Sequence, residues 1–275
     1  GVANEAGQVE YEQVRKILSV AKKNGIVILD TAANYGNSED VLGKVGVDSF
    51  RVVTKLPALP NYEINIAQWV TEKVSESSIR LGQEKIYGLL LHRAEDLVCS
   101  RGAILAQALL DLQHDGLFQK LGVSIYDPEE LDLVFKKMKI ELVQAPLNVV
   151  DRRLQLSGWL DYLKVNDVEV HARSAFLQGL LLMKRTEIPK KFLRWSSLWD
   201  EWYEKLNALG VSPLVASLSY PLSLDEVDQV IVGVDSAAQL SEIVQAVADI
   251  EGGTDMSFMC STDLDLVNPF NWHRL

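Results

Sequence analysis

Four polar side chains that could move a proton follow one another along the chain: Asp30, Tyr35, Lys55 and His92. A free tyrosine has a pKa of about 10, so it exchanges protons poorly at neutral pH. A nearby ammonium such as Lys55 favours the phenolate, and Asp30 could hold that lysine charged and oriented. With His92 orienting a carbonyl oxygen, Tyr35 could protonate that oxygen as hydride arrives, or take the proton back. None of these side chains can deliver hydride, so this chemistry needs a nicotinamide cofactor.

Short apolar runs alternate with helix-period segments almost from end to end of the chain. The runs predicted as strands are residues 26–30, 50–56, 86–92, 120–126, 141–148, 169–176 and 228–234. The segments predicted as helices are residues 9–25, 38–46, 66–82, 103–116, 128–138, 156–166, 212–223 and 237–250. Strands joined by helices of this length pair in parallel through right-handed crossovers. The strands are almost unbroken apolar runs, which indicates a sheet covered on both faces.

These elements predict an α/β fold of the (β/α)8 TIM-barrel class, with residues 1–275 as one domain. Such a barrel has eight strands, whereas the pattern gives seven. The first helix begins near Val9 with no strand before it, so we expect a first strand to be missing before Gly1. The alternative is an open, seven-stranded doubly wound sheet. No Gly-x-Gly-x-x-Gly follows any strand, which weakens a dinucleotide-binding fold of that kind.

The four polar residues all lie at or just after the ends of predicted strands. Asp30 ends the first strand, Lys55 lies near the end of the second and His92 ends the third. In an α/β barrel the C-terminal ends of the strands meet at one mouth, where active sites are built. The barrel therefore predicts that these residues converge despite their separation in sequence.

Composition excludes several classes of partner. The formal net charge of −11 argues against a nucleic-acid or anionic-membrane binder. No apolar run is long enough to span a membrane, and no signal peptide is visible. Cys99 and Cys260 show no metal-like spacing, and no Asp, Glu and His set suggests a metal site. We expect a reduced, cytoplasmic protein, monomeric or weakly dimeric, that acts on a small molecule.

The stretch DTAANYGNSEDVLG, residues 30–43, resembles the signature Asp-Thr-Ala-x-x-Tyr-Gly-x-Ser-Glu-x-x-Leu-Gly of the aldo-keto reductases. VVTKL and LLLH match the lysine and histidine strands of that family, and the resemblance covers essentially the whole chain. It implies an eight-stranded (β/α) barrel that reduces aldehydes and ketones with NADP(H), less often NAD(H). It also implies catalytic roles for Asp30, Tyr35, Lys55 and His92. FLQGLLLM and VIVGVDS look like bacterial members associated with surface-sugar pathways.

The resemblance also implies how the cofactor is bound. Ser124 and Gln144 would hold the nicotinamide carboxamide, although Ile125 stands where many members have Asn. Arg173 takes the place of an aromatic residue that often stacks on the nicotinamide. FLQGLLL resembles the loop that wraps the pyrophosphate, and VIVGVDSAAQLSEIV the strand and helix that hold the adenosine end. The remaining cofactor residues implied in this way are Ser174, Leu177, Gly179, Gly233, Asp235, Ser236, Gln239 and Glu242.

The adenosine end departs from the usual NADPH pattern. NADPH-specific members often place Lys or Arg there for the 2′-phosphate, whereas this chain has Gly233, Asp235 and Gln239. A carboxylate near a phosphate dianion is unfavourable, but Ser236, Gln239 and the helix N-terminus favour an anion. We expect NADP(H), with NAD(H) or dual use as the alternative.

Two other classes of protein remain open from the sequence. A non-catalytic sensor or regulatory subunit that binds a nicotinamide cofactor, such as the potassium-channel β-subunits, could share the fold. An isomerase or lyase on the same barrel would need a phosphate-binding site or a metal cluster.

In the Trp-rich segment 195–210, four aromatic residues are spaced for one helix face, which favours a packing role: Trp195, Trp199, Trp202 and Tyr203. The tail 267–275 is a candidate to fold over the barrel mouth.

Overall fold

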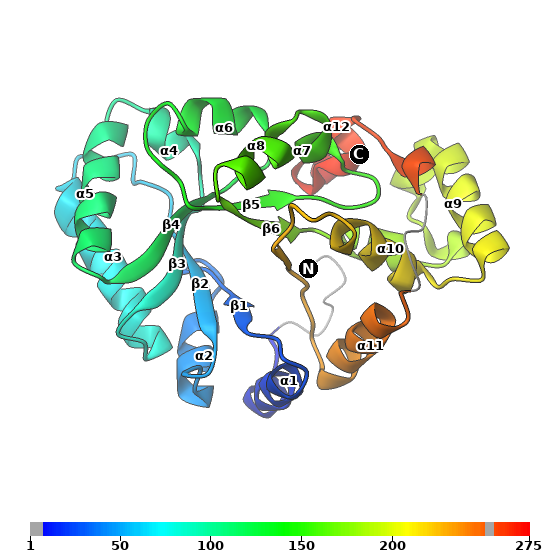
Figure 1. Ribbon diagram of the computed structural model, residues 1–275, viewed down its shortest axis with the longest axis horizontal. Helices are drawn as coiled ribbons and strands as arrows, with labels where there is room; N and C mark the ends of the chain where they lie inside the picture. The colour runs from blue at the N-terminus through cyan, green and yellow to red at the C-terminus, as the bar shows by residue number, and fades with distance from the viewer. Residues whose placement is uncertain (1–7, 251–255) are drawn as a thin grey trace.

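The computed structural model describes residues 8–250 and 256–275, and its centre is one curled, parallel sheet of seven strands (Figure 1). The strands follow one another in chain order, each parallel to the next. Their bounds are β1 (Ile28–Asp30), β2 (Arg51–Leu56), β3 (Ile86–Leu91), β4 (Phe118–Ser124), β5 (Leu142–Pro146), β6 (Glu169–Arg173) and β7 (Gln229–Val230). Sequential order with parallel pairing is the arrangement of a barrel wall, not of a doubly wound sheet.

Helices surround the outer side of the sheet (Figure 1). The α-helices are α1 (Tyr11–Lys23), α2 (Ser38–Val45), α3 (Ile66–Leu81), α4 (Glu95–Val98), α5 (Gly102–His114), α6 (Glu129–Val134), α7 (Arg153–Leu156), α8 (Trp159–Val165), α9 (Ser196–Leu209), α10 (Pro213–Leu222), α11 (Ala237–Ala248) and α12 (Leu264–Val267). Short 3-10 helices are η1 (Leu177–Leu182), η2 (Arg185–Glu187), η3 (Lys190–Trp195), η4 (Ser257–Met259) and η5 (Pro269–Arg274).

The buried apolar side chains form separate clusters on the two sides of the strands. The largest cluster packs the sheet against the helices. A smaller cluster comprises Ile28, Val53, Tyr87, Leu90 and Leu142, which come from four neighbouring or near-neighbouring strands. A sheet that buries apolar side chains on both faces has nearly continuous apolar strands, as the sequence predicted.

Gly43 and Gly82 occupy positions that disfavour a side chain, the first because of a close contact and the second because of its backbone conformation. A Cβ at Gly43 would lie 2.0 Å from the carbonyl oxygen of Arg80 in α3. Glycine therefore lets α2 approach α3 closely. Gly82 ends α3 in the left-handed conformation, with φ of 65°, which glycine adopts without steric cost.

Some predicted elements differ in extent. The predicted strand 228–234 is a strand only at β7, which pairs with β6 through two residues. Among the described residues no strand pairs with the other edges of β1 and β7, so this part of the sheet lacks the support that extends a strand. The predicted helix 156–166 begins only at Trp159, as α8, because Gly158 adopts a φ of 79° and separates it from the preceding α7.

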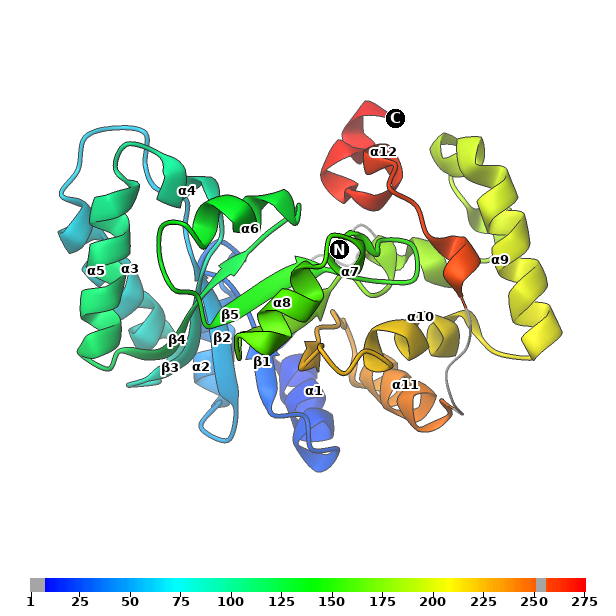
Figure 2. The same cartoon turned by 45° about the horizontal axis from the view of Figure 1, so that its top comes forward.

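The C-terminal segment packs on η3, which leads into α9. Trp199 and Trp202 of α9 are fully buried, which agrees with the expected packing role of the tryptophans. Lys191 of η3 donates to the carbonyl oxygen of Trp272 at 2.9 Å. Figure 2 shows α12 and α9 on the same side of the molecule. In the part of the chain that the structure describes, no helix has the length and apolar character needed to cross a membrane.

Candidate active site

A buried ion pair joins the ends of β1 and β2. The Lys55 ammonium lies 2.7 Å from both carboxylate oxygens of Asp30 and donates to the carbonyl oxygen of Thr31 at 3.0 Å. Only 1% of the Lys55 side chain and 12% of the Asp30 side chain are exposed. Burial lowers the pKa of Lys55, while the charge and hydrogen bonds of Asp30 oppose that shift. Asp30 is thus the counterion of a lysine that the fold removes from water.

Tyr35 stands beside this pair, in the turn that follows β1. The Lys55 ammonium lies 5.2 Å from the centroid of the Tyr35 ring. His92 approaches the same ring edge-on, with centroids 5.9 Å apart and an angle of 80° between the planes. The structure thus brings Tyr35 and His92 together beside the Lys55–Asp30 pair, at the strand ends where the sequence analysis expected them.

The pKa of Tyr35 shifts upward, against the direction expected from a neighbouring lysine. Tyr35 is 48% exposed, but partial burial of the residue, together with the Asp30 carboxylate, raises its pKa to about 12, although Arg173 acts in the opposite direction. The phenol therefore keeps its proton at neutral pH, as a proton donor must. Burial and the Lys55 and Arg173 cations lower the pKa of His92, which favours the neutral imidazole.

A cavity of about 870 Å³ opens over these residues. Its walls contain most of the residues predicted to form the site: Asp30, Tyr35, His92, Ser124, Gln144, Arg173, Ser174, Gly179, Gly233, Asp235, Gln239 and Glu242. Lys55 lies beneath Asp30 and does not line the cavity. Leu177 and Ser236 also lie outside the lining. Pro269 and Phe270 do line it, so the C-terminal tail reaches the mouth as expected.

Gln144 connects the predicted carboxamide site to the ion pair. Its side-chain amide donates to Asp30 at 2.7 Å across the inside of the sheet. Gln144 of β5 is the register partner of Ser124 of β4, and both are almost fully buried. The two side chains that the resemblance assigned to the nicotinamide carboxamide are therefore neighbours at one wall of the cavity.

The loop after β6 holds three residues in the left-handed region. Ser174, Leu177 and Gln178 have φ of 62°, 44° and 55°, and each such residue costs about 1–3 kcal/mol unless its surroundings compensate. The Asn148 side chain donates to the Ser174 carbonyl oxygen at 3.0 Å. Leu177 is fully buried, so its side chain anchors the loop in the core. Backbone strain of this kind concentrates at functional sites.

At the other end of the cavity, the predicted adenosine residues cap α11. The Ser236 hydroxyl accepts the backbone N–H of Gln239 at 3.1 Å. The side-chain carbonyl of Gln239 accepts the backbone N–H of Asp235 at 2.7 Å. These bonds fix the first turn of α11 at the cavity wall, where the helix N-terminus favours a negatively charged group.

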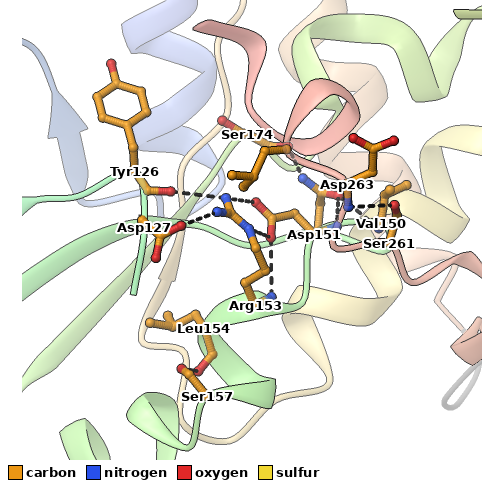
Figure 3. Close-up of polar contacts among 12 residues, drawn as sticks. Tyr126, Asp127, Val150, Asp151, Arg153, Leu154, Ser157, Ser174, Ser261 and Asp263 are labelled. Atoms are coloured by element: carbon orange, nitrogen blue, oxygen red, sulfur yellow. Dashed lines mark hydrogen bonds and ion pairs between the residues drawn. The ribbon is translucent and has the colours of Figure 1, made fainter. Parts of the chain in front are cut away.

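The sequence analysis missed a polar network behind the cavity (Figure 3). Fully buried Asp151 receives two hydrogen bonds of 2.9 Å from the guanidinium of Arg153. Arg153 also pairs with Asp127 at 2.7 Å and donates to the Tyr126 carbonyl oxygen at 3.1 Å. The signal was the run NVVDRR, in which polar residues directly follow a buried strand.

A second buried carboxylate that the sequence analysis missed lies within the 30–43 stretch. Glu39 is 2% exposed and accepts hydrogen bonds from Thr54, Ser77 and Arg80. It links α2 to α3 and to Thr54 of β2, the residue that precedes Lys55. Among the described residues, no group of three or more His, Cys, Asp or Glu side chains could hold a metal ion.

Comparison with known proteins agrees with this geometry. The model of the aldo/keto reductase family matches residues 1–251. L-glyceraldehyde 3-phosphate reductase of Escherichia coli K12 is 26% identical over 88% of this chain and 81% of its own length. An aldo-keto reductase of Bacillus halodurans aligns with a TM-score of 0.72 at 22% identity, covering 91% of this chain and 86% of its own. Glycerol dehydrogenase of Gluconobacter oxydans aligns with a TM-score of 0.71 at 23% identity, covering 90% and 83%.

The two solved structures share the fold with this chain, and the family match extends over nearly all of its length. The relatives are bacterial, as the sequence analysis predicted. The chain belongs to the aldo/keto reductase family and is an NAD(P)H-dependent oxidoreductase.

Proposed function

We propose that this protein reduces the carbonyl of an aldehyde, ketone or sugar-like substrate to an alcohol, with Tyr35 as general acid and base. The observation that carries the proposal is the convergence of Tyr35 and His92 on the Asp30–Lys55 ion pair at the cavity wall. The cofactor, when bound, supplies the hydride that no side chain can deliver.

Each side chain has a separate role in the proposed reaction. Tyr35 holds the proton that the carbonyl oxygen receives, because its raised pKa keeps the phenol protonated. The Lys55 ammonium, fixed by Asp30, stabilises the phenolate left behind. His92 as a neutral imidazole can donate a hydrogen bond to the carbonyl oxygen and hold it near the phenol.

The cavity residues fit a nicotinamide cofactor. Ser124 and Gln144 can hold the carboxamide. The hydrogen bond from the Gln144 side-chain N–H to Asp30 orients this amide, and its carbonyl oxygen can then accept an N–H of the cofactor. The N-terminus of α11 suits a phosphate. We propose NADP(H) as the preferred cofactor, with NAD(H) as the alternative that Asp235 favours.

The substrate class is supported by what the similar proteins do. One relative is named for reducing L-glyceraldehyde 3-phosphate and one similar structure is a glycerol dehydrogenase. Both names describe small, hydroxylated molecules. The cavity lining combines polar side chains such as His92 and Gln239 with apolar ones such as Leu214 and Phe270. A small polyhydroxylated carbonyl fits such a mixed surface.

A finer proposal concerns the barrel wall. A second cavity of about 860 Å³ lies between β1 and β7, next to α1 and α11. Its walls are largely apolar and include Leu18, Ile28, Val230 and Ile243. We propose that an eighth parallel strand occupies this gap and closes the barrel. Such a strand would pair with the outer edges of both β1 and β7.

We also propose that residues 1–275 form one domain, working in the cytoplasm as a monomer or weak dimer. The unbroken strand order supports one domain, because every strand is hydrogen-bonded to its neighbour in sequence. The two cysteines, Cys99 and Cys260, form no disulfide, which suits a reducing compartment.

Tyr35→Phe tests the proposed function. Oxidation of NADPH and NADH is followed in parallel with glyceraldehyde as substrate, for the parent, Tyr35→Phe and the control Tyr62→Phe. Tyr62 is 69% exposed and lies outside both cavities. We expect a loss of about 10²–10⁴-fold in kcat for Tyr35→Phe and no change for Tyr62→Phe. Equal rates for parent and Tyr35→Phe would refute the role of Tyr35, and cofactor binding without turnover would favour a sensor.

A further inference from the structure

Arg173, at the end of β6, places a positive charge at the cavity wall without a carboxylate beside it. Its guanidinium donates to the carbonyl oxygen of Ile125 at 2.8 Å and to the hydroxyl of Ser174 at 3.3 Å. Both acceptors are neutral. Among the ion pairs that the described residues form, none includes Arg173. Burial lowers the pKa of Arg173, and Tyr126, Tyr35 and the more distant carboxylates of Asp30 and Asp151 oppose that shift. A guanidinium stays charged in proteins.

The position of this guanidinium is fixed by the loop after β4. The guanidinium carbon of Arg173 lies 4.6 Å from the centroid of the Tyr126 ring. Glu130 accepts the backbone N–H of Tyr126 at 2.8 Å, and Arg153 donates to its carbonyl oxygen at 3.1 Å. Figure 3 shows the Tyr126 ring pointing away from Arg153, so only its backbone is tied to that network. The ring is left to stack on Arg173.

The other charges near the centre of the site are balanced. Lys55 is paired with Asp30 at 2.7 Å, and the lowered pKa of His92 favours its neutral form. Tyr35 keeps its proton at neutral pH because its pKa is raised to about 12. Arg173 is therefore a cation at the strand ends that no carboxylate contacts, since Asp30 is held by Lys55 and Asp151 by Arg153.

We infer that Arg173 makes this site bind a reduced nicotinamide cofactor more tightly than the oxidised form. The inference rests on the proposed function, in which Ser124 and Gln144 hold the carboxamide. Gln144 and Arg173 come from the adjacent strands β5 and β6, and the register pairs Arg173 with Pro146, two residues beyond Gln144. A nicotinamide ring held there lies in the same cavity as the guanidinium.

The physical basis is the charge of the ring. An oxidised nicotinamide carries one positive charge, whereas the reduced dihydronicotinamide is neutral. Like charges repel strongly where water is partly excluded, and the reduced ring avoids that repulsion. The rest of the cofactor is identical in the two forms, so its contribution cancels in the ratio of the two dissociation constants. Arg173 thereby favours loading for reduction and release of the oxidised cofactor.

Calorimetric titration tests the inference without turnover. Kd values for NADPH, NADP⁺, NADH and NAD⁺ are measured for the parent, Arg173→Gln, Arg173→Lys and the control Arg185→Gln. Arg185 pairs with Asp200 and lines neither cavity. The parent should bind the reduced form more tightly. In Arg173→Gln the ratio Kd(oxidised)/Kd(reduced) should fall at least ~10-fold, while Arg173→Lys should keep most of the preference and Arg185→Gln all of it.

Several results would overturn the inference. If the parent binds both forms equally, or the oxidised form more tightly, the inference is refuted before any variant is measured. An equal weakening of both forms in Arg173→Gln would show that Arg173 contacts a part common to both, such as a phosphate. A ratio that falls as far in Arg173→Lys as in Arg173→Gln would show that guanidinium shape, not charge, is responsible. A parent that binds no cofactor would refute the proposed function itself, whereas binding of both forms with equal affinity would refute only the inference about Arg173.

Discussion

Replacing Asp30 with asparagine should destabilise the folded protein although the side chain keeps its shape. The variant leaves the Lys55 ammonium, 1% exposed, with only the neutral Asn amide and the carbonyl oxygen of Thr31 at 3.0 Å. Removing one partner of a buried ion pair costs about 3–5 kcal/mol, because the remaining charge loses its compensation. We expect the free energy of unfolding to fall by that amount at pH 7.

The double variant Asp30→Asn/Lys55→Met should recover most of this loss. Methionine fills a similar volume and needs no counterion, and replacing a whole buried pair by apolar groups is often neutral or stabilising. The exposed pair of Asp200 and Arg185 provides the control, because Asp200→Asn should cost less than about 1 kcal/mol. Urea denaturation followed by tryptophan fluorescence measures all four proteins.

The lowered pKa of Lys55 also determines how the free energy of unfolding changes with pH. The pKa of Lys55 is lower in the folded protein than its ordinary value, so the unfolded chain binds this proton more readily. Stability from this group therefore rises as pH increases through the alkaline range between the two pKa values. Asp30→Asn removes the carboxylate that opposes the lowering of the Lys55 pKa. The loss of unfolding free energy in this variant should therefore shrink with rising pH, by at most about 1.4 kcal/mol per pH unit.

Two results would refute this reasoning. The first is a cost below about 1 kcal/mol for Asp30→Asn at pH 7, which would mean that Lys55 is not buried as a cation. The second is a deficit that stays constant between neutral and alkaline pH, which would mean that the loss does not arise from the lysine charge.

Further predictions concern the other buried acids and Tyr35. Glu39→Gln should lower the free energy of unfolding by about 2–4 kcal/mol in urea denaturation, because the Arg80 pair is broken; an unchanged midpoint would contradict this. Burial opposes ionisation of Glu169, but hydrogen bonds from His171, Lys120 and Tyr87 lower its pKa to about 2. The stability that Glu169 contributes should thus be present above pH ~4.5 and be lost as pH falls towards 2. This part of the acid-induced loss of unfolding free energy should be absent from Glu169→Gln when both proteins are titrated with acid. Ultraviolet difference titration of parent against Tyr35→Phe should show no ionisation of Tyr35 below about pH 11, since its pKa is about 12.

Most residues at the centre of the candidate site could be predicted from the sequence because they lie where a buried strand stops, and Tyr35 lies in the turn that follows one. Asp30, Lys55 and His92 end or nearly end apolar runs, and parallel strands bring their C-terminal ends to one mouth. Periodicity also predicted the helices and most strands well. Strand 228–234 was overpredicted, because its extent depends on neighbours that the local pattern does not contain.

Charge balance inside the site depended on the tertiary structure. The bond from Gln144 to Asp30 joins residues 114 positions apart. The upward shift in the pKa of Tyr35 depends on how far the fold shields its phenol from water and on the nearby Asp30 carboxylate. The sequence places Arg173 in the last part of a strand. It does not show that the fold gives this residue neutral acceptors and a tyrosine ring in place of a carboxylate.

The sequence by itself therefore determined the set of chemical groups, their order and the strand ends that carry them. Only the tertiary structure decided which charges are paired, because pairing depends on strand register, on curvature of the sheet and on the loops that close behind it. The Asp151–Arg153 network illustrates this, since it holds the Tyr126 backbone from a different strand end. Such long-range contacts leave no period in the sequence, whereas burial of a strand or one face of a helix does.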